Sequence, residues 1–265
     1  MQLPWFDSHA HFDIADIADP IERACNAGLA GILAVGGSEE LNYAALEAAR
    51  AAPDFVSLSL GWDRSQAEVI TPAQVREQLV AESGHCHQNG IKLAAIGETG
   101  LDYHYESDTA PAQRRLFESQ VELAGELGLP VVVHSREADA DTLAILRNSG
   151  SAALASKGRL GVLHCFTGDR EFAEKLLELG LCISFSGIVT FRNADPLREV
   201  ARMIPGARLL VETDSPYLAP VPLRGRTNEP AFVSHVGQCL ADVRNETPES
   251  LAHQTTENAR HLFGL

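Results

Sequence analysis

The sequence predicts an α/β fold, a (β/α)₈ TIM barrel that residues 1–265 form as a single domain. Short apolar runs alternate with longer segments at helical spacing, and the alternation repeats about eight times, as this barrel requires. The apolar runs are nearly continuous, as expected for parallel strands that are buried on both faces. A chain of 265 residues also has the length of such a barrel, about 250 residues.

The strands are assigned to runs of apolar and β-branched residues. We expect them near Leu3–His9, Ile32–Gly36, Val56–Gly61, Leu93–Glu98, Val131–His134, Leu160–His164, Cys182–Ser186 and Leu209–Glu212.

The helices are assigned to segments rich in Ala, Leu, Glu and Arg. We expect them near Ile17–Ala27, Glu39–Ala51, Pro72–Asn89, Pro111–Leu127, Ala138–Asn148, Arg170–Leu179, Pro196–Met203, Ala231–Val243 and Pro248–Phe263. Residues that tolerate a positive φ follow several of these segments, at Asn89-Gly90, Gly128 and Gly180, and support the predicted helix ends.

Composition narrows the classes of function. The formal net charge of −15 argues against a protein that coats duplex DNA through a broad basic face. No stretch reaches the roughly 18 consecutive apolar residues of a membrane span, and no signal peptide precedes the first strand, so we expect a cytoplasmic protein with no membrane partner. The five cysteines are widely spaced and odd in number, which favours reduced thiols. Nothing in the sequence indicates an obligate protein partner.

Six potential metal ligands stand at or near the C-terminal ends of predicted strands. They are His9, His11, Glu98, His134, His164 and Asp214. Each alone is better explained as a satisfied buried polar residue. Together they would lie on the rim where barrel enzymes place their chemistry, and such a coincidence favours a divalent-metal centre.

The spacing of His9 and His11 supports this centre. Two residues apart on a strand, their side chains project to the same side and can bind one ion. His85 and His87 have the same spacing but fall on a predicted helix, where they point about 200° apart. We therefore expect that pair on the surface, together with the helical histidines His235, His253 and His261.

Two neighbours of the ligands have other expected roles. Cys165 follows His164 in an alternating strand, so it should point away from the centre as a packed thiol rather than act as ligand or nucleophile. Glu212, two residues before Asp214, could face the centre as an outer partner of a ligand or could pair with an arginine.

The segments FDSHAHFD, GETGLDYH, PVVVHSREA, GVLHCFTG, ISFSGIVTFRNA and LLVETDSPYLAPVPLRGRTNEP resemble the TatD family of metal-dependent hydrolases, in particular its YcfH-type branch. The resemblance spans nearly the whole chain. It implies a TIM barrel of the amidohydrolase superfamily with one or two divalent metal ions and a phosphodiesterase, usually deoxyribonuclease, activity. It also implies that the six residues above bind metal and that Glu98 bridges two ions.

The resemblance further implies substrate contacts at the mouth of the barrel. These would come from Arg136, Arg224, Arg226, Asn228 and Glu229, although solvated loop charges are an alternative explanation.

One segment departs from the family. After the third strand the family usually has Gly-x-His-Pro, whereas SLGWDRSQ places Trp62 and Asp63 there. This difference affects substrate choice or rate rather than metal binding. His104 in the next loop could replace the missing histidine, and the Trp62 ring could stack on a nucleobase.

The sequence thus predicts a hydrolase that acts on phosphodiesters, with DNA as a substrate that is single-stranded or frayed rather than a long duplex. Asp214 would act as general base and Glu98 as a catalytic metal bridge. Four histidines favour zinc or manganese, and the two carboxylates leave magnesium open. Alternatives are a hydrolase of a carbonyl ester, amide or lactone, favoured if the three arginines point outward, and a non-catalytic binding protein.

Overall fold

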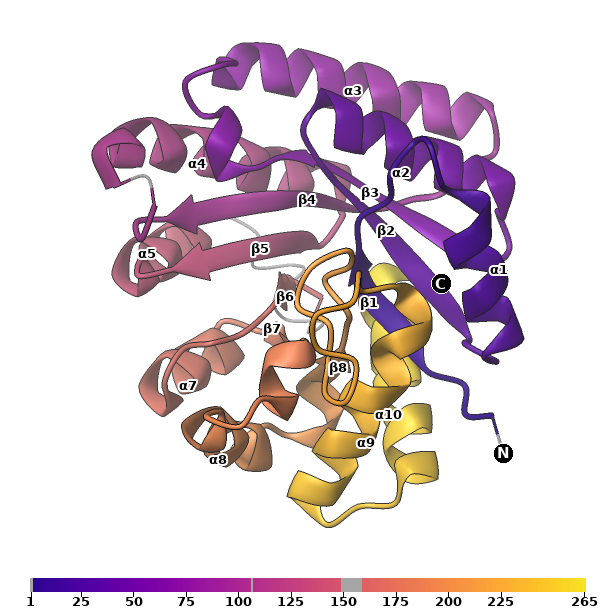
Figure 1. The fold of residues 1–265 in the computed structure, drawn as a ribbon. Coiled ribbons are helices and arrows are strands. Elements are labelled where there is room, and N and C mark those ends of the chain that lie inside the picture. The colour runs from indigo at the N-terminus through magenta and orange to yellow at the C-terminus, as the bar shows by residue number, and fades with distance from the viewer. Residues whose placement is uncertain (1, 106, 149–158) are drawn as a thin grey trace.

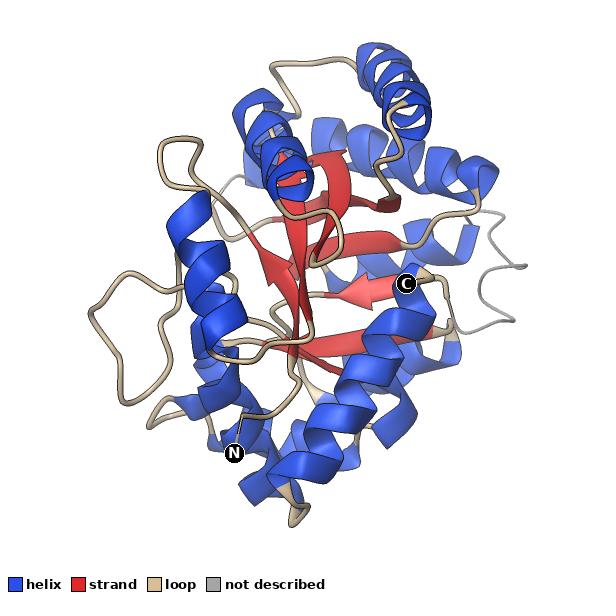
Figure 2. Ribbon diagram, turned by 90° about the vertical axis from the view of Figure 1, so that its right-hand side faces the viewer, coloured by secondary structure: helices blue, strands red, loops and turns tan. Residues whose placement is uncertain are grey.

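Eight strands form one parallel sheet in the order of the chain, and helices surround it (Figures 1 and 2). The computed structural model describes residues 2–105, 107–148 and 159–265. The strands are β1 (Phe6–Ala10), β2 (Gly31–Gly37), β3 (Val56–Trp62), β4 (Leu93–Asp102), β5 (Val131–Arg136), β6 (Gly161–Leu163), β7 (Leu181–Phe185) and β8 (Leu209–Val211). The predicted (β/α)₈ TIM barrel is confirmed.

The helices follow the strands as predicted. They are α1 (Ala18–Asn26), α2 (Glu39–Ala51), α3 (Pro72–Gln88), α4 (Ala110–Leu127), α5 (Asp139–Asn148), α7 (Arg170–Glu178), α8 (Asp195–Met203), α9 (Val233–Arg244) and α10 (Pro248–Phe263). Local sequence explains the ends: Thr71 and Gln74 form a capping box before α3, and Gly128 ends α4 with a φ of 69°. No helix in the described part of the chain is long and apolar enough to cross a membrane.

Three strand boundaries differ from the prediction by two residues or more, and the other differences are of one residue. β1 begins at Phe6 rather than Leu3, and Pro4, which has no N–H to donate to a ladder, precedes it. β4 continues past Glu98 to Asp102, and β5 continues past His134 to Arg136. Glu98 and His134 therefore lie inside their strands, and the paired backbone beyond them holds both side chains firmly.

The barrel interior is apolar at one end of the strands and polar at the other. Val132 and Val162 are fully buried in the interior cluster. His134 and His164 stand two residues further along the chain, and residues at this spacing on an extended chain share one face. At the opposite end, the Phe6 ring lies 6.4 Å from that of Phe263 in α10. The alternation that fills the core with apolar residues thus turns the histidines into the barrel.

The two ends of the sheet meet beside the predicted centre. A parallel bridge joins Ala10 to Ser215, and the amide of Asp214 donates to the carbonyl of His9 at 3.0 Å. The amide of His11 donates to the carbonyl of Ser215 at 2.9 Å. Barrel closure therefore brings the histidines of the first strand next to the aspartate that follows the last.

Candidate metal centre

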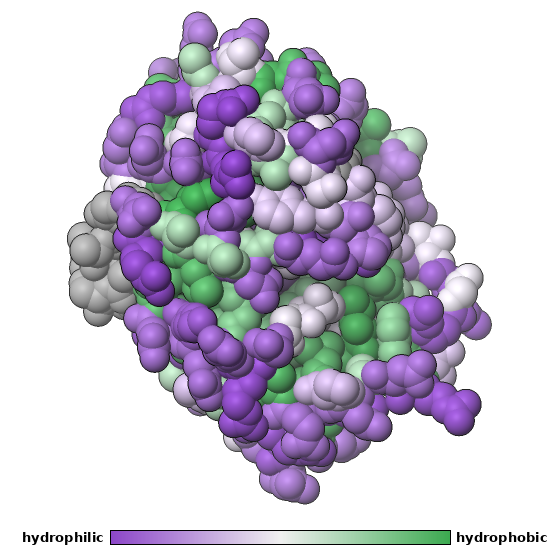
Figure 3. Space-filling model, turned by 90° about the vertical axis from the view of Figure 1, so that its left-hand side faces the viewer, coloured by the Kyte–Doolittle hydropathy of each residue, from purple (hydrophilic) through white to green (hydrophobic). Residues whose placement is uncertain are grey.

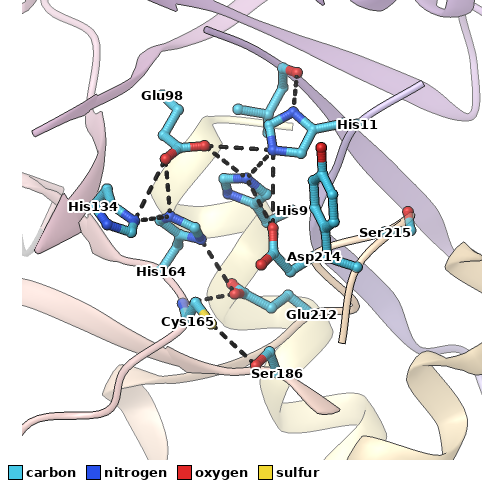
Figure 4. A network of polar contacts seen from close by, with 12 residues as sticks. His9, His11, Glu98, His134, His164, Cys165, Ser186, Glu212, Asp214 and Ser215 are labelled. Carbon is cyan, nitrogen blue, oxygen red and sulfur yellow. Dashed lines mark hydrogen bonds and ion pairs between the residues drawn. The ribbon is translucent and has the colours of Figure 1, made fainter. Parts of the chain in front are cut away.

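The six predicted ligands converge at the polar end of the barrel, as Figure 4 shows. They come from β1 and its extension, β4, β5 and the segments after β6 and β8. Two groups of potential donors, each within 4.8 Å of one another, contain them: His9, His11 and Asp214 in one, Glu98, His134 and His164 in the other.

The first group surrounds one oxygen of Glu98. Oε2 of Glu98 lies 3.5 Å from Nε2 of His9 and 3.4 Å from Nε2 of His11. Oδ1 of Asp214 lies 3.8 Å from both ring nitrogens. Two imidazole nitrogens and two carboxylate oxygens thus face one small space, a donor set suited to a divalent cation.

The second group surrounds the other oxygen of the same carboxylate. Oε1 of Glu98 lies 3.5 Å from Nδ1 of His134 and 3.4 Å from Nε2 of His164. The two ring nitrogens are 3.3 Å apart. Glu98 therefore spans the two groups with one oxygen in each, the arrangement that a bridging carboxylate needs.

The far nitrogens of three histidines have partners that orient the rings. Nδ1 of His11 lies 2.9 Å from the carbonyl of Val35, and Nε2 of His134 lies 3.2 Å from Oδ2 of Asp102. Nδ1 of His164 lies 3.4 Å from Oε1 of Glu212, a distance for an ion pair, and it forms no hydrogen bond within the described residues. Such partners fix which nitrogen faces a metal and make it a better donor.

The contact of Glu212 with His164 fits the role of outer partner, one of the two roles open from the sequence, although Glu212 also forms a third group of potential donors with His9 and His164. Glu212 is fully buried, and its Oε1 also accepts the amide of Cys165 at 2.6 Å. Cys165 lies with its Sγ 3.2 Å from the Ser186 hydroxyl, and burial raises the pKa of its thiol well above the ordinary value. A protonated thiol is a poor nucleophile, which agrees with the packed role predicted for Cys165.

Burial dominates the ionisation of two residues in the first group. It lowers the pKa of His9 to about 3, so this ring is neutral at pH 7 and its nitrogen is free to coordinate. It raises the pKa of Asp214 to about 7, although the neighbouring His164 and His11 oppose the shift. The pKa of Asp214 in the metal-free protein therefore lies near neutral pH, where a carboxylate can both accept and return a proton.

The pKa values of Glu98 and His164 shift in the opposite directions, down for the carboxylate and up for the imidazole. Burial raises the pKa of Glu98, but the charge of His164 and hydrogen bonds from the histidines outweigh it and hold the pKa well below the ordinary value. Burial lowers the pKa of His164, but the carboxylates of Glu98 and Glu212 raise it well above the ordinary value. In the protein without metal, a proton on His164 supplies positive charge that these buried carboxylates require.

The residues present fit a divalent cation. Nε2 of His9 and Nε2 of His11 face each other at 3.1 Å, and at most one of them can donate to the other. Nδ1 of His9 is buried and has no hydrogen-bond partner in the described residues. Three carboxylates surround the rings, the buried Glu98 and Glu212 and the partly exposed Asp214, and a cation would neutralise this excess of negative charge.

A local irregularity in β4 accompanies Glu98. The pairing of β4 with β5 changes register between Ile96 and Thr99, where the peptide bond between Gly97 and Glu98 is cis. Gly97 has a φ of 147°, and a Cβ there would lie 2.5 Å from the carbonyl of Val132. Only glycine fits this close approach in the backbone that precedes Glu98.

The centre opens into a cavity of about 760 Å³ at the mouth of the barrel. Asn228 and Glu229 line it, as predicted, but both have structural partners there. Nδ2 of Asn228 donates to the carbonyl of Thr213 at 2.8 Å, and Oε2 of Glu229 lies 2.6 Å from Nε of Arg23. Their predicted contact with substrate remains a hypothesis.

The other predicted mouth residues lie elsewhere. The guanidinium of Arg136 lies 4.7 Å from the centre of the Tyr105 ring, and that of Arg224 lies 3.7 Å from the centre of the Phe191 ring. Arg226 is exposed, and Nδ1 of exposed His104 lies 2.6 Å from Glu137. Within the described chain none of these four residues lines the cavity.

The face around the mouth mixes hydrophilic and hydrophobic residues. Figure 3 views the side toward which the arrows of β4 and β5 point in Figure 1, and hydrophobic areas lie between the hydrophilic residues there. The chain as a whole has a formal charge of −15. A polyanion would therefore reach the centre through local positive groups and not through a basic face.

The stacking role predicted for Trp62 is wrong. Only 6% of this residue is exposed, and it lines a separate cavity beside α2 and α3. Residues alternate faces along a strand, so the last residue of β3 turns its ring outward between sheet and helices, while Asp63, the next residue, lines the cavity at the centre. A nucleobase at the metal cluster would not meet this ring.

Two residues at the site, Arg64 and Asp102, were not predicted from the sequence. Arg64 lines the cavity with its Nη1 3.0 Å from Oε1 of Glu98. Asp102 holds the ring of His134. Asp102 could have been found as the last residue of the motif GETGLD, where an acid follows the predicted ligand by four positions. Arg64 gave a weaker signal, the departure of its segment from the family pattern.

The histidines predicted to lie outside the site do so. His85 and His87 are exposed on α3, and His253 and His261 are exposed on α10. His235 is partly buried on α9. None of the five belongs to a group of potential metal ligands in the described part of the chain.

Comparisons with known proteins agree with this geometry. Residues 6–264 match the model of a family described as TatD related DNase. The uncharacterized metal-dependent hydrolase YcfH of Escherichia coli (strain K12) is 51% identical over 71% of this chain and 66% of its own. The protein named 3′-5′ ssDNA/RNA exonuclease TatD, from Rahnella sp. (strain Y9602), is 38% identical over 92% of this chain and 91% of its own. The crystal structure of the TatD homologue YJJV from Escherichia coli K12 matches with a TM-score of 0.87 and 29% identity over the full length of both chains.

Proposed function

The chain belongs to the TatD related DNase family of metal-dependent hydrolases, and we propose that it is a divalent-metal-dependent phosphodiesterase that acts on DNA ends. The observation that carries this proposal is the pair of ligand groups that share Glu98. Paired metal sites of this kind serve phosphatases and nucleases because they can hold both the attacking and the leaving oxygen of a phosphoryl transfer. The exonuclease named among the relatives supports the choice of DNA as substrate.

His9, His11 and Asp214 would hold one cation, His134 and His164 the other, and Glu98 would contact both. When bound, the cations would polarise a phosphate and lower the pKa of water at the site. Four imidazoles favour zinc or manganese, and the carboxylates also admit magnesium. Metal analysis of the purified protein measures occupancy, and reconstitution with each metal measures competence.

Asp214 is proposed as the general base. Its carboxylate faces the ligand groups and would accept a proton from the attacking water and later return one to the leaving oxygen. His134 and His164 keep their rings fixed through Asp102 and Glu212, so the ligands need not reorganise during the reaction. Glu98 would be catalytic as the carboxylate between the two cations.

The preferred substrate is proposed to be a single-stranded or frayed end rather than a long duplex. The chain carries a formal charge of −15, and duplex binding relies on many neutralised phosphates. A narrow terminal strand needs only a few contacts to enter a cavity of about 760 Å³. Faster cleavage of long duplex than of single strands would contradict this preference.

One observation favours a second candidate, a hydrolase of carbonyl esters, amides or lactones. Arg224 and Arg226, which resemblance to the family places at the substrate, are exposed outside the cavity. Without these two arginines at the centre, fewer positive groups favour a phosphodiester over a neutral substrate. Hydrolysis of bis(p-nitrophenyl) phosphate and p-nitrophenyl acetate, measured side by side with each metal, separates the two activities.

The proposed role of Asp214 is tested by Asp214→Asn. We expect turnover of single-stranded DNA to fall by about 100- to 10,000-fold, the usual contribution of a general base. Metal content should remain close to that of the unmodified protein because five other ligands are retained. Asp54→Asn is the matched control, since Asp54 is exposed just before β3 at the opposite end of the barrel. Undiminished turnover in Asp214→Asn would remove this residue from the base role.

A further inference from the structure

Arg64 stands on a short loop that the end of β3 fixes in place. Asp63 follows β3 directly and caps the 3₁₀ helix η1 (Arg64–Gln66): its Oδ1 accepts the amide of Ser65 at 2.7 Å. The amide of Asp63 donates to the carbonyl of Gly37 at 2.7 Å. Arg64 is thus the first residue of a turn that is tied to β2 on one side and capped from within.

Trp62 anchors the same loop from the other side. Its ring is buried, and its backbone amide and carbonyl both bond to the side-chain amide of Gln120 in α4, each at 2.8 Å. Nε2 of Gln120 also lies 2.7 Å from the hydroxyl of Thr99, the residue after Glu98. The loop that carries Arg64 and the strand that carries Glu98 are therefore fixed to one another through Gln120.

The guanidinium of Arg64 reaches the centre from this loop. Its Nη1 lies 3.0 Å from Oε1 of Glu98 and 3.6 Å from Oδ2 of Asp63, and 27% of its side chain is exposed. The exposed part lines the cavity that the metal ligands also line. Arginine stays protonated at any pH at which the protein is folded, so Arg64 brings a permanent positive charge to the ligand group.

A phosphate would otherwise meet a strongly acidic cavity. Its acidic lining residues are Asp13, Asp16, Glu40, Asp63, Glu98, Asp214 and Glu229. Arg23 and Arg64 are the arginines among the described residues of the lining, and Arg23 lies against Glu229 at 2.6 Å. Of these two, Arg64 is the one in contact with the carboxylate that spans both ligand groups.

We propose that Arg64 binds a non-bridging oxygen of the phosphate that is placed at the ligand groups, and so makes the site select phosphodiesters over neutral esters. The inference rests on the proposed function and names its phosphate-binding residue. Guanidinium groups suit this task because their N–H donors match the geometry of phosphate oxygens and remain charged. Trp62 and Asp63 then act as positioning residues, which explains why this segment departs from its family without loss of the six ligands.

The test uses Arg64→Ala, Arg64→Lys and a matched control, Arg115→Ala, which removes the same charge from an exposed position on α4. Binding of inorganic phosphate to each metal-loaded protein is measured by titration calorimetry. We expect Arg64→Ala to weaken phosphate binding by about 10- to 100-fold, the range for hydrogen bonds to charged groups. The phosphate affinity of Arg64→Lys should lie between those of Arg64→Ala and the unmodified protein. Arg115→Ala should bind phosphate as tightly as the unmodified protein does.

Kinetics and metal content complete the test. The value of kcat/KM for bis(p-nitrophenyl) phosphate should fall in Arg64→Ala by a similar factor, mainly through KM, while metal per chain stays constant. Equal phosphate affinity in Arg64→Ala and the unmodified protein would overturn the inference. Loss of metal from both Arg64 variants would also overturn it, because Arg64 would then merely support Glu98. If the unmodified protein hydrolyses no phosphodiester with any metal, the proposed function itself fails, and the inference with it.

Discussion

The inner wall of the barrel and the loops around its mouth contribute charged residues in different ways. On the inner wall, strands from different parts of the barrel bring His9, Glu98 and His134 close together, and each is buried or nearly so. At the mouth, Arg224 and Arg226 are exposed, while Arg64 turns inward from a capped loop. Strand pairing determines the direction of a side chain on the wall. In a loop, the capping and turn contacts determine this direction.

This difference has a functional meaning. Metal binding requires donors held within a few tenths of an ångström, and paired strands with oriented histidines provide such a site. Substrate choice can vary among relatives by exchange of loop residues on an unchanged scaffold. The chain would then keep the hydrolytic centre of its family on the wall and place its own phosphate contact, Arg64, in the loop after β3.

The largest effect is expected from a change on the wall. His164→Ala removes a proposed ligand that lies between Glu98 and Glu212, and it leaves these buried carboxylates without their main counter-charge. We expect activity to fall by at least about 1,000-fold and bound metal to decrease, because the remaining donors no longer complete the second group. Metal analysis and turnover of single-stranded DNA measure both effects.

His253→Ala provides the control for that change. His253 is exposed on α10 and belongs to no group of potential ligands in the described chain. It should therefore keep metal and activity. A His164→Ala protein with full metal content and turnover would contradict the role given to the wall.

An intermediate effect is expected from the outer partner of His134. Asp102→Asn keeps the size of the side chain but removes the carboxylate that lies 3.2 Å from Nε2 of His134. This hydrogen bond, together with backbone amides, lowers the pKa of Asp102 to about 2 although burial opposes it, so the residue is ionised at neutral pH. We expect a decrease of about 10- to 100-fold in metal affinity or activity.

Competition with a coloured chelator measures the metal affinity of Asp102→Asn. Asp108→Asn, an exposed change in the following loop, should leave that affinity unaltered. If Asp102→Asn binds metal as tightly as the unmodified protein and retains its activity, the orientation of His134 does not depend on this contact.

The smallest effect is expected at the mouth. Arg224→Ala breaks the contact of its guanidinium with the Phe191 ring, which is worth about 0.5–1 kcal/mol at an exposed site. We expect a small loss of thermal stability and a change of no more than about twofold in kcat/KM. A decrease as large as that of Arg64→Ala would show that the exposed arginines bind substrate and would remove the distinction between the two kinds of loop position.

The sequence was informative about the wall for physical reasons. Period-two alternation and the common rim of parallel strands require residues such as His134 and His164 to share the interior with Val132 and Val162, so their convergence could be predicted. The role of Asp102 depends on how far β4 extends, and the predicted strand stopped at Glu98.

The mouth was less predictable for equally physical reasons. Trp62 is the last residue of β3, and its burial depends on which face of the strand it occupies. Sequence patterns locate the ends of strands poorly, so this face was difficult to predict. The direction of Arg64 follows from a cap by Asp63 and a clamp by Gln120, which comes from a helix more than 50 residues away in the chain. Long-range contacts of this kind leave no local signature.

The metal dependence of the centre is tested most directly by hydrolysis of end-labelled single-stranded DNA by metal-stripped protein, with Mg²⁺, Mn²⁺ or Zn²⁺ added back. We expect no cleavage by the stripped protein, cleavage restored by at least one of the metals, and loss of that cleavage in Asp214→Asn. Cleavage that is independent of metal, or no cleavage with any of the three, would contradict the assignment of a metal-dependent phosphodiesterase to this centre.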